Sequence, residues 1–188
     1  IILFLYVCRG LKHAHRLGIV HRDIKPDNIL VSVVDRKPVP KLIDFGIAKI
    51  NRPDLRNNPT MTQLGQIVGS PRYMSPEQFQ GKKVDKRSDV YSSALVLFEL
   101  LSRSPYRKGD TTEEMMQDAK RIEPERLSEA IVRNEGSSES RAFAKYCRRD
   151  LDWIMAKALA PDPAQRYADM QAFSSDLKAA IRGDAVSV

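Results

Sequence analysis

Two carboxylates in this chain have neighbours that suit the transfer of a phosphoryl group. Asp23 is followed by Lys25 and Asn28, and Asp44 begins a short turn that contains glycine. A carboxylate can orient an attacking hydroxyl, a cation can meet charge on the transferred group, and an amide oxygen with a second carboxylate can hold magnesium. For any one of these residues alone, a turn or a helix cap is the simpler interpretation. Four fitting residues in this order and spacing favour the chemical one.

The pattern around these residues predicts a mostly helical chain with a few short strands. A long segment over about 44–75 has no clear periodicity and is broken by asparagine and proline, and such loops are usually functional. A near-continuous apolar run predicts a central helix surrounded by protein, and Thr111 or Thr112 is expected to cap the helix that follows it. The polar stretch over about 121–140 is expected to contain a mobile loop at 135–138. The expected elements are a helix over 1–17 that is buried on most sides and ends at Gly18, short strands at 19–20, 29–34 and 39–43, and helices at 86–101, 151–159 and 168–181.

The run from His21 to Asn28, with Asp44-Phe45-Gly46 downstream, resembles the catalytic loop and the metal-binding turn of protein kinases. Lys25, two residues after Asp23, resembles the serine/threonine class, and the C-terminal third resembles bacterial multidomain kinases. The resemblance implies a mainly α fold with a few short strands, the C-terminal lobe of a kinase domain. It covers 1–188, with the catalytic loop at 21–28, the activation segment at 44–77 and the central helix at about 86–101.

The resemblance implies a role for each residue of the candidate site. Asp23 would accept a hydrogen bond from the substrate hydroxyl, and Lys25 would reach the γ-phosphate of ATP. Asn28 and Asp44 would be oxygen ligands of Mg²⁺. Leu30 would lie under the adenine ring, although a core leucine of a strand is an equally good interpretation of the sequence.

Five further residues are expected to hold the site together. By resemblance, His21 and Phe45 stack between the catalytic loop and the metal-binding turn, and Asp89 accepts hydrogen bonds from amides of the catalytic loop. Glu77 is expected to pair with Arg166 as a buried carboxylate–guanidinium contact. A surface ion pair, which contributes little, is the alternative for these two residues.

Regulation is also implied by resemblance. Arg22 precedes the proposed base, and kinases of that type often need a phosphorylated activation loop that neutralises this arginine. Thr60 and Thr62 are the candidate phosphorylation sites, and Lys49 could share the phosphate. An ordinary loop role is equally open for both threonines. Ser70 resembles the hydroxyl residue of the loop that contacts the protein substrate.

The expected activity is transfer of the γ-phosphoryl group of ATP to serine or threonine hydroxyls of proteins, with Mg²⁺. The sequence contains no G-x-G-x-x-G loop and no V-A-I-K-like strand, which kinases carry in an N-terminal lobe. We therefore interpret the chain as the C-terminal lobe cut inside a helix, and expect it to bind ATP poorly and to be inactive on its own. The alternative is a non-catalytic scaffold derived from a kinase.

The composition agrees with a folded protein and disfavours several other classes. The chain has 188 residues, 42% of them hydrophobic, and a net charge of +7. Its basic residues are scattered among acids without interleaved aromatics, which disfavours nucleic-acid binding. The apolar start is too short for a membrane span. Cys8 and Cys147 lack metal-site spacing, so two reduced thiols and a cytoplasmic location are expected, with a membrane segment elsewhere in the protein left open.

Overall fold

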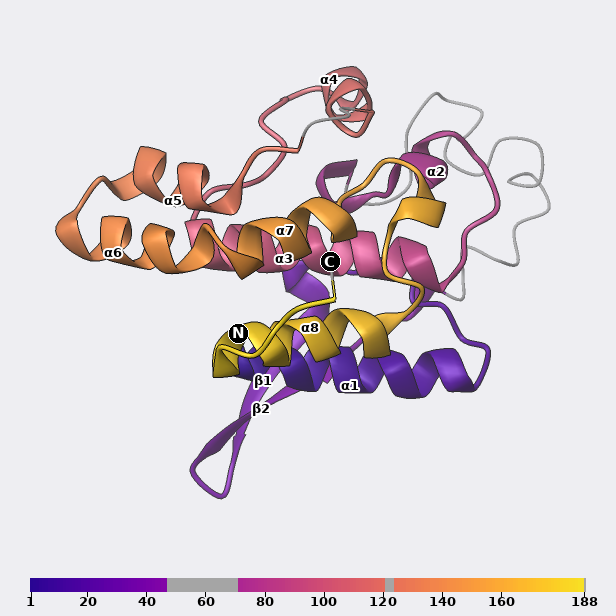
Figure 1. Cartoon of the computed structure of the whole chain (residues 1–188). Coiled ribbons are helices and arrows are strands. Elements are labelled where there is room, and N and C mark those ends of the chain that lie inside the picture. Colours follow the sequence, from indigo (N-terminus) through magenta and orange to yellow (C-terminus); the bar gives the residue numbers. More distant parts are fainter. Residues whose placement is uncertain (47–70, 121–123, 188) are drawn as a thin grey trace.

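The computed structural model describes residues 1–46, 71–120 and 124–187. Within these ranges the chain is mainly helical and has one two-stranded antiparallel sheet, which confirms the expected fold class (Figure 1). Short 3-10 turns lie at Pro26–Asn28, Pro71–Tyr73 and Pro163–Gln165. The helices and strands are α1 (Ile2–Arg16), β1 (Ile29–Val34), β2 (Lys37–Leu42), α2 (Pro76–Phe79), α3 (Lys86–Ser102), α4 (Thr112–Asp118), α5 (Leu127–Glu135), α6 (Ser138–Cys147), α7 (Asp150–Ala158) and α8 (Met170–Arg182).

Helix α3 is the centre of the fold. Every residue from Ser88 to Phe98 is buried, and α3 packs against α1, α5, α7 and α8. The Asp85 side chain caps the helix by accepting the backbone N–H of Arg87. A helix that is buried all round needs apolar or internally bonded side chains on every face. The predicted central helix at 86–101 is therefore confirmed to within one residue.

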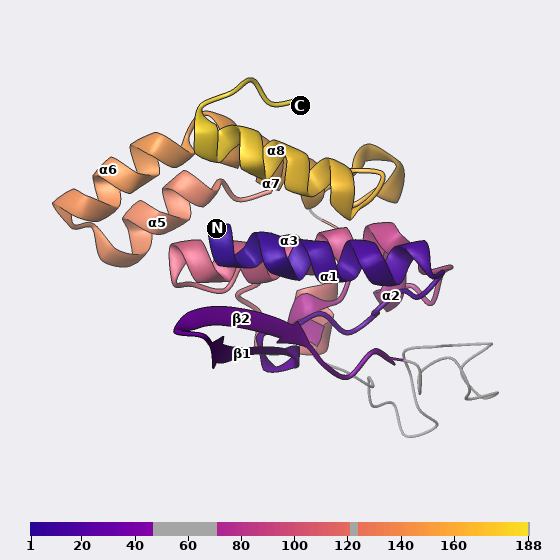
Figure 2. The same cartoon turned by 90° about the horizontal axis from the view of Figure 1, so that it is seen from below.

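Helix α1 is amphipathic rather than buried on most sides, so that part of the prediction was wrong. It buries a stripe that includes Phe4 and Leu11, whereas Ile2 and Tyr6 are 67% and 54% exposed. The helix lies beside α8 and β2 (Figure 2). It ends where predicted, because Gly18 takes a φ of +74°, which residues with a β-carbon rarely adopt.

Strands β1 and β2 form a hairpin that projects away from the helices (Figure 1). Val34 pairs with Lys37, so only Asp35 and Arg36 form the turn, and both have positive φ, as a type I′ turn requires. The strand predicted at 29–34 is thus confirmed with its bounds, and the strand predicted at 39–43 is present but shifted to 37–42. The third was wrong: residues 19–20 are not part of a strand.

The polar stretch after α4 also differs from the prediction. Residues 127–135 and 138–147 form α5 and α6, and the expected loop at 135–138 is only the turn between them, with Gly136 at a φ of +63°. Helices α7 and α8 lie where the sequence predicts them. Thr111 caps α4 and, with Glu114, forms a capping box.

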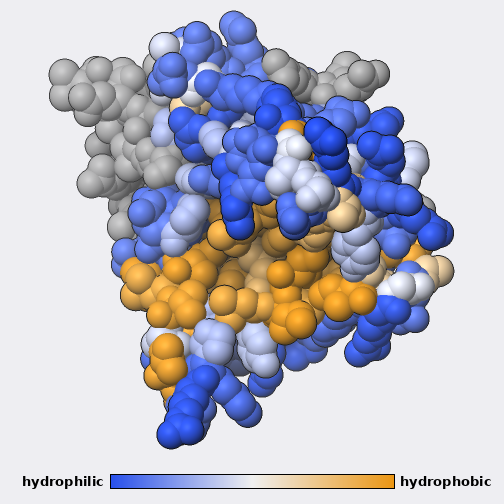
Figure 3. Space-filling model, turned by 90° about the vertical axis from the view of Figure 1, so that its left-hand side faces the viewer, coloured by the Kyte–Doolittle hydropathy of each residue, from blue (hydrophilic) through white to orange (hydrophobic). Residues whose placement is uncertain are grey.

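Apolar side chains gather on one face of the molecule (Figure 3). A cavity of about 340 Å³ on the apolar surface is lined by residues of α1, β1 and α3, including Phe4, Val31 and Leu100. It reaches Pro26, the first residue of the 3-10 turn, and Ile29, which follows that turn. This surface therefore borders the predicted catalytic loop. None of the helices in the described ranges combines the length and the apolar character that a membrane span requires.

Candidate active site

The predicted catalytic loop begins at the N-terminal end of α3. Oδ2 of Asp89 accepts the backbone N–H of His21 at 2.8 Å, and Oδ1 accepts that of Arg22 at 2.9 Å. Nε2 of His15, from α1, lies 2.7 Å from the same carboxylate. Asp89 is 1% exposed, and these contacts compensate for the hydrogen bonds to water that its carboxylate loses on burial. The central helix thus fixes where the loop starts.

Asp23, Lys25 and Asn28 lie together in the loop. The amide nitrogen of Asn28 donates to the backbone oxygen of Asp23 at 2.8 Å and to its Oδ2 at 3.2 Å. Nζ of Lys25 lies 3.6 Å from the same Oδ2. Both bonds of Asn28 use its nitrogen, so its oxygen is the atom that remains to bind a cation. One carboxylate, one cation and one amide therefore occupy a single cluster.

The segment that carries Asp44 is joined to this loop by backbone hydrogen bonds. The N–H of Ile43 donates to the carbonyl of Asn28 at 3.1 Å, and the N–H of Gly46 donates to the carbonyl of His21 at 2.8 Å. Asp44 itself is exposed. Since the residue before Asp44 is bonded to Asn28, the two proposed metal ligands belong to neighbouring backbone segments.

The rings of His21 and Phe45 are in contact, with centroids 4.4 Å apart and planes inclined by 38° rather than stacked in parallel. Nε2 of His21 lies 3.1 Å from the carbonyl of Ile43 and donates to it in the Nε2–H tautomer. Burial lowers the pKa of His21 below its ordinary value, against the opposing charge of Asp89. A buried, neutral imidazole that is hydrogen-bonded to backbone fits a packing role.

Two residues of the site have a strained backbone. Arg22 and Asp44 have φ values of +64° and +55°, in the left-handed region that residues with a β-carbon seldom adopt. Each costs on the order of 1 kcal/mol or more and persists only where surrounding contacts hold it. Two contacts hold Arg22: its N–H donates to Asp89, and its carbonyl accepts a hydrogen bond from Nε2 of Gln78 at 2.9 Å.

The donor set of Asn28 and Asp44 fits magnesium. An amide oxygen and a carboxylate are hard oxygen ligands, and magnesium usually takes one or two protein ligands together with phosphate oxygens and water. The described residues contain no cluster of three or more histidine, cysteine or acidic side chains that could hold a metal ion. A magnesium ion held by Asn28 and Asp44 would complete its coordination with water or phosphate oxygens.

The predicted contact between Glu77 and Arg166 is present and buried. Nη1 and Nη2 of Arg166 donate to the two carboxylate oxygens of Glu77, each at 2.8 Å, and Ser88 donates to Oε1 at 2.5 Å. The guanidinium also donates to three backbone carbonyls, which include that of Arg87. This pair fastens α2 to α3 and to the segment before α8.

The remaining predicted residues are placed as follows. Leu30 lies on β1 and is 52% exposed, so it is not a core residue in the described structure. Arg22 is partly buried, and its Nε has no hydrogen-bond partner among the described residues. The residues outside the described ranges are Lys49, Thr60, Thr62 and Ser70.

Three residues with contacts at the site or at the segment 71–74 were not identified from the sequence. Gln78 binds the carbonyl of Arg22, His15 contacts Asp89, and Arg107 is buried against the segment 71–74. The Ser-x-x-Gln spacing of a capping box could have drawn attention to Gln78, since its Oε1 accepts the N–H of Ser75. The other two contacts join distant parts of the chain and leave no local pattern.

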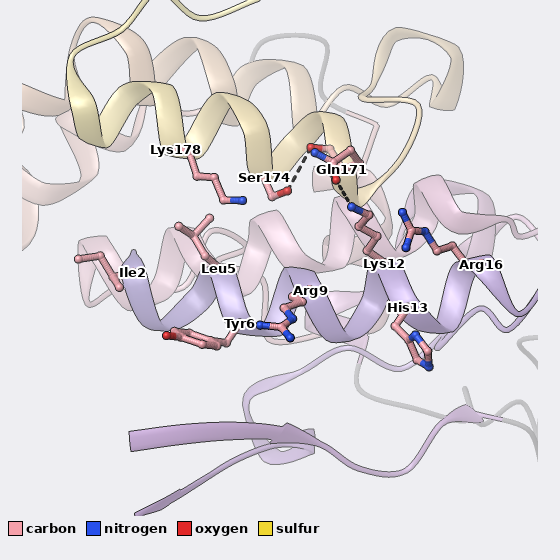
Figure 4. Close-up of a pocket in the computed structure, with 10 residues that line it drawn as sticks. All are labelled: Ile2, Leu5, Tyr6, Arg9, Lys12, His13, Arg16, Gln171, Ser174 and Lys178. Atoms are coloured by element: carbon pink, nitrogen blue, oxygen red, sulfur yellow. Dashed lines mark hydrogen bonds between the residues drawn. The ribbon is translucent and has the colours of Figure 1, made fainter. Parts of the chain in front are cut away.

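A cavity of about 550 Å³ lies elsewhere, between α1 and α8 (Figure 4). Its lining includes four basic side chains, those of Arg9, Lys12, Arg16 and Lys178. Lys12 reaches across to Gln171 of α8. None of the predicted catalytic or metal-binding residues lines this cavity, so its size does not make it the candidate active site.

Similar proteins are serine/threonine kinases of bacteria. The chain is 36% identical over 180 residues to a probable serine/threonine-protein kinase of Streptomyces coelicolor, 37% over 181 residues to the probable kinase PknB of Bifidobacterium longum, and 36% over 177 residues to PknB of Mycobacterium tuberculosis. These matches cover 94–96% of this chain but only 24–25% of each relative. The model of the protein kinase domain matches residues 2–177. A match over that much of the chain shows that it belongs to the protein kinase domain family.

Proposed function

We propose that the protein containing this chain transfers the γ-phosphoryl group of ATP to serine or threonine hydroxyls of protein substrates. The observation that carries this proposal is the clustering of Asp23, Lys25 and Asn28 beside the segment of Asp44. These are the groups that phosphoryl transfer needs, and the chain belongs to a family of protein kinases.

Orientation is the main contribution proposed for Asp23. Its carboxylate accepts the hydrogen bond of the substrate hydroxyl and aims that oxygen at the γ-phosphorus. A bond then forms between this oxygen and phosphorus, the bond from phosphorus to the β–γ bridging oxygen breaks, and ADP leaves with that electron pair. The hydroxyl proton passes to Asp23 and then to solvent. Asn28 holds the carboxylate in place through Oδ2.

Two further groups are proposed to neutralise the negative charge of the phosphates, and one residue to contact the adenine. Nζ of Lys25, already beside Asp23, is proposed to meet the γ-phosphate. Asn28 and Asp44 would hold magnesium, which neutralises phosphate charge when bound. Leu30, exposed on β1, would cover one face of the adenine ring.

The same proposal extends to the domain and its control. Residues 1–188 would form the C-terminal lobe, with the catalytic loop at 21–28 and the activation segment at 44–77. The apolar face beside Pro26 and Ile29 is a surface that other parts of the protein could cover.

Phosphate on Thr60 or Thr62 would meet Arg22 and Lys49, and Ser70 would contact the protein substrate. Use of ATP and the unpaired thiols favour the cytoplasm.

The test compares this chain alone with the same chain joined to a nucleotide-binding lobe. We expect phosphate transfer to a serine peptide from the joined protein only, and a loss of about 10²-fold or more in kcat with Asp23→Asn. The matched control is Asp184→Asn, the same change at an exposed position near the C-terminus. Transfer that survives Asp23→Asn would contradict the assignment, and strong Asp23-dependent transfer by the chain alone would contradict the need for a second lobe.

A further inference from the structure

Arg107 is a fully buried arginine in the connection between α3 and α4. Its Nη1 donates to the carbonyls of Pro71 and Arg72 at 2.7 and 3.2 Å. Its Nη2 donates to the carbonyl of Met74 at 2.5 Å and to the hydroxyl of Tyr91 at 3.1 Å. One side chain therefore binds three of the four carbonyls of the segment 71–74.

Among the described residues, the partners of this guanidinium are neutral groups. Within the described part of the chain, no acidic side chain lies within ion-pair distance of Arg107, and its partners are backbone and hydroxyl oxygens. The guanidinium carbon lies 5.1 Å from the ring centroid of Phe79 and 5.5 Å from that of Tyr91. Ring faces and carbonyl dipoles thus replace water around a buried cation.

Other contacts complete the attachment of this segment. Ser92, on α3, donates to the carbonyl of Tyr73 at 2.7 Å, so all four carbonyls of 71–74 accept a side-chain hydrogen bond. In return, Nη1 of Arg72 donates to the carbonyl of Arg107 at 2.9 Å. A segment with one 3-10 turn and no strand partner would otherwise leave these groups to water. Side chains of α3 and Arg107 therefore determine its path.

The segment 71–74 is linked to the catalytic loop through α2. Gln78 of α2 donates to the carbonyl of Arg22, the residue before Asp23. The ring of Tyr91 joins the two attachments, because the guanidinium carbon of Arg166 also lies over it, at 4.6 Å from the centroid. A shift of the segment 71–74 would therefore also displace Gln78 next to Arg22 and disturb the packing of Arg166 on Tyr91.

We propose that Arg107 is a positioning residue. It holds the segment 71–74 in the position in which that segment presents a protein substrate to Asp23. This inference rests on the proposed kinase function, since the segment follows the proposed substrate-contacting Ser70. It assigns to Arg107 an effect on protein substrate and none on ATP, because its contacts lie on the α2 side of the catalytic loop and not at Asn28 or Asp44.

The kinetic test uses Arg107→Met and Arg107→Lys in the chain joined to its nucleotide-binding lobe. Methionine keeps much of the volume and removes every donor, so we expect the KM for a peptide substrate to rise about tenfold while the KM for ATP changes less than about twofold. Lysine keeps the charge but has fewer and differently placed donors. The peptide KM of Arg107→Lys is therefore expected to lie between those of wild type and Arg107→Met. Equal effects on both KM values, or none on the peptide, would overturn the proposal.

A second measurement on the 188-residue chain does not depend on catalysis. Amide hydrogen exchange over 71–79 is expected to be faster in Arg107→Met than in wild type. The control is Ser128→Ala, which removes a buried hydrogen bond between α5 and α7 that involves no residue of this segment and is expected to leave exchange over 71–79 unchanged. Unchanged exchange in Arg107→Met refutes the positioning role, whereas a joined wild-type protein that transfers no phosphate refutes the proposed function instead.

Discussion

The carboxylate of Asp89 lies 2.8 Å from the backbone nitrogen of His21, a residue 68 positions earlier in the chain. Its second oxygen accepts the next amide, that of Arg22. Asp89 stands in the first turn of α3, where the helix dipole favours a negative charge. The most deeply buried helix of the fold therefore holds the start of the proposed catalytic loop through a single side chain.

Replacing this carboxylate should destabilise the chain more than an ordinary surface change. Asp89→Ala leaves two backbone N–H groups without their acceptor, at a cost of about 1–3 kcal/mol for each buried group. We expect the free energy of unfolding in urea to fall by about 3 kcal/mol. Asp85→Ala, at the N-cap of the same helix, removes the cap and a partly exposed ion pair with Arg87, and should cost about 1–2 kcal/mol. Equal losses in the two variants would show that Asp89 does not anchor the loop.

The pair of Glu77 and Arg166 gives a second stability prediction. Arg166→Met leaves the carboxylate of Glu77 buried without its partner, which typically costs about 3–5 kcal/mol. The double variant Glu77→Leu, Arg166→Met removes both charges and should lose less than the sum of the two single losses. Urea unfolding of the four proteins at neutral pH measures this coupling. Strictly additive losses would contradict a direct interaction.

The stabilising effect of this pair should depend on pH. Burial raises the pKa of Glu77, but the hydrogen bonds and charge of Arg166 outweigh it and hold the pKa below its ordinary value. A lowered pKa stabilises the folded state at pH values above the ordinary pKa of glutamate. This stabilisation is lost as the pH falls toward the lower pKa that Glu77 has in the folded chain. The stability gap between wild type and Arg166→Met should therefore narrow in acid. A gap that widens in acid would contradict this assignment.

The two cysteines should be unreactive in the folded chain. Burial raises the pKa of Cys8 and of Cys147 to about 12, and Asp152 adds to the effect at Cys147. Only about 10⁻⁴ of each thiol would be ionised at pH 8, against about a quarter of an exposed cysteine. A disulfide reagent should label neither thiol quickly in buffer and both in concentrated urea. Rapid labelling of native protein would show that the thiols are accessible.

Several features were predictable because they depend on residues close together in the sequence. The apolar run of α3, the left-handed Gly18 and the capping box at Thr111 each combine an intrinsic preference with neighbours within about one turn. The proposed catalytic loop was assigned from the spacing of Asp23, Lys25 and Asn28. Strand β1 was predicted with its observed bounds, whereas the ends of β2 were shifted, because strand ends are set by the register of pairing.

Other features required the folded chain. Helices α5 and α6 carry many charged residues. Their apolar stripes stabilise a helix only when they pack, that of α5 against α3 and α7 and that of α6 against α7. The exposed face of α1 followed from which side of that helix meets α3 and α8. Apolar content alone does not say which face of a helix finds a partner.

The amino-acid sequence by itself indicated the kind of chemistry that we propose, since its residue types and short spacings suit a base, a cation and two oxygen ligands. Only the tertiary structure decided how these groups are held. Gln78 and Arg107 bind backbone groups that lie 56 and 33 positions away. The contact of Asp89 across 68 positions was expected only through the family resemblance. The positive φ of Arg22 persists because two such contacts outweigh its local cost. Contacts of that range arise from packing, and no local pattern in the chain encodes them.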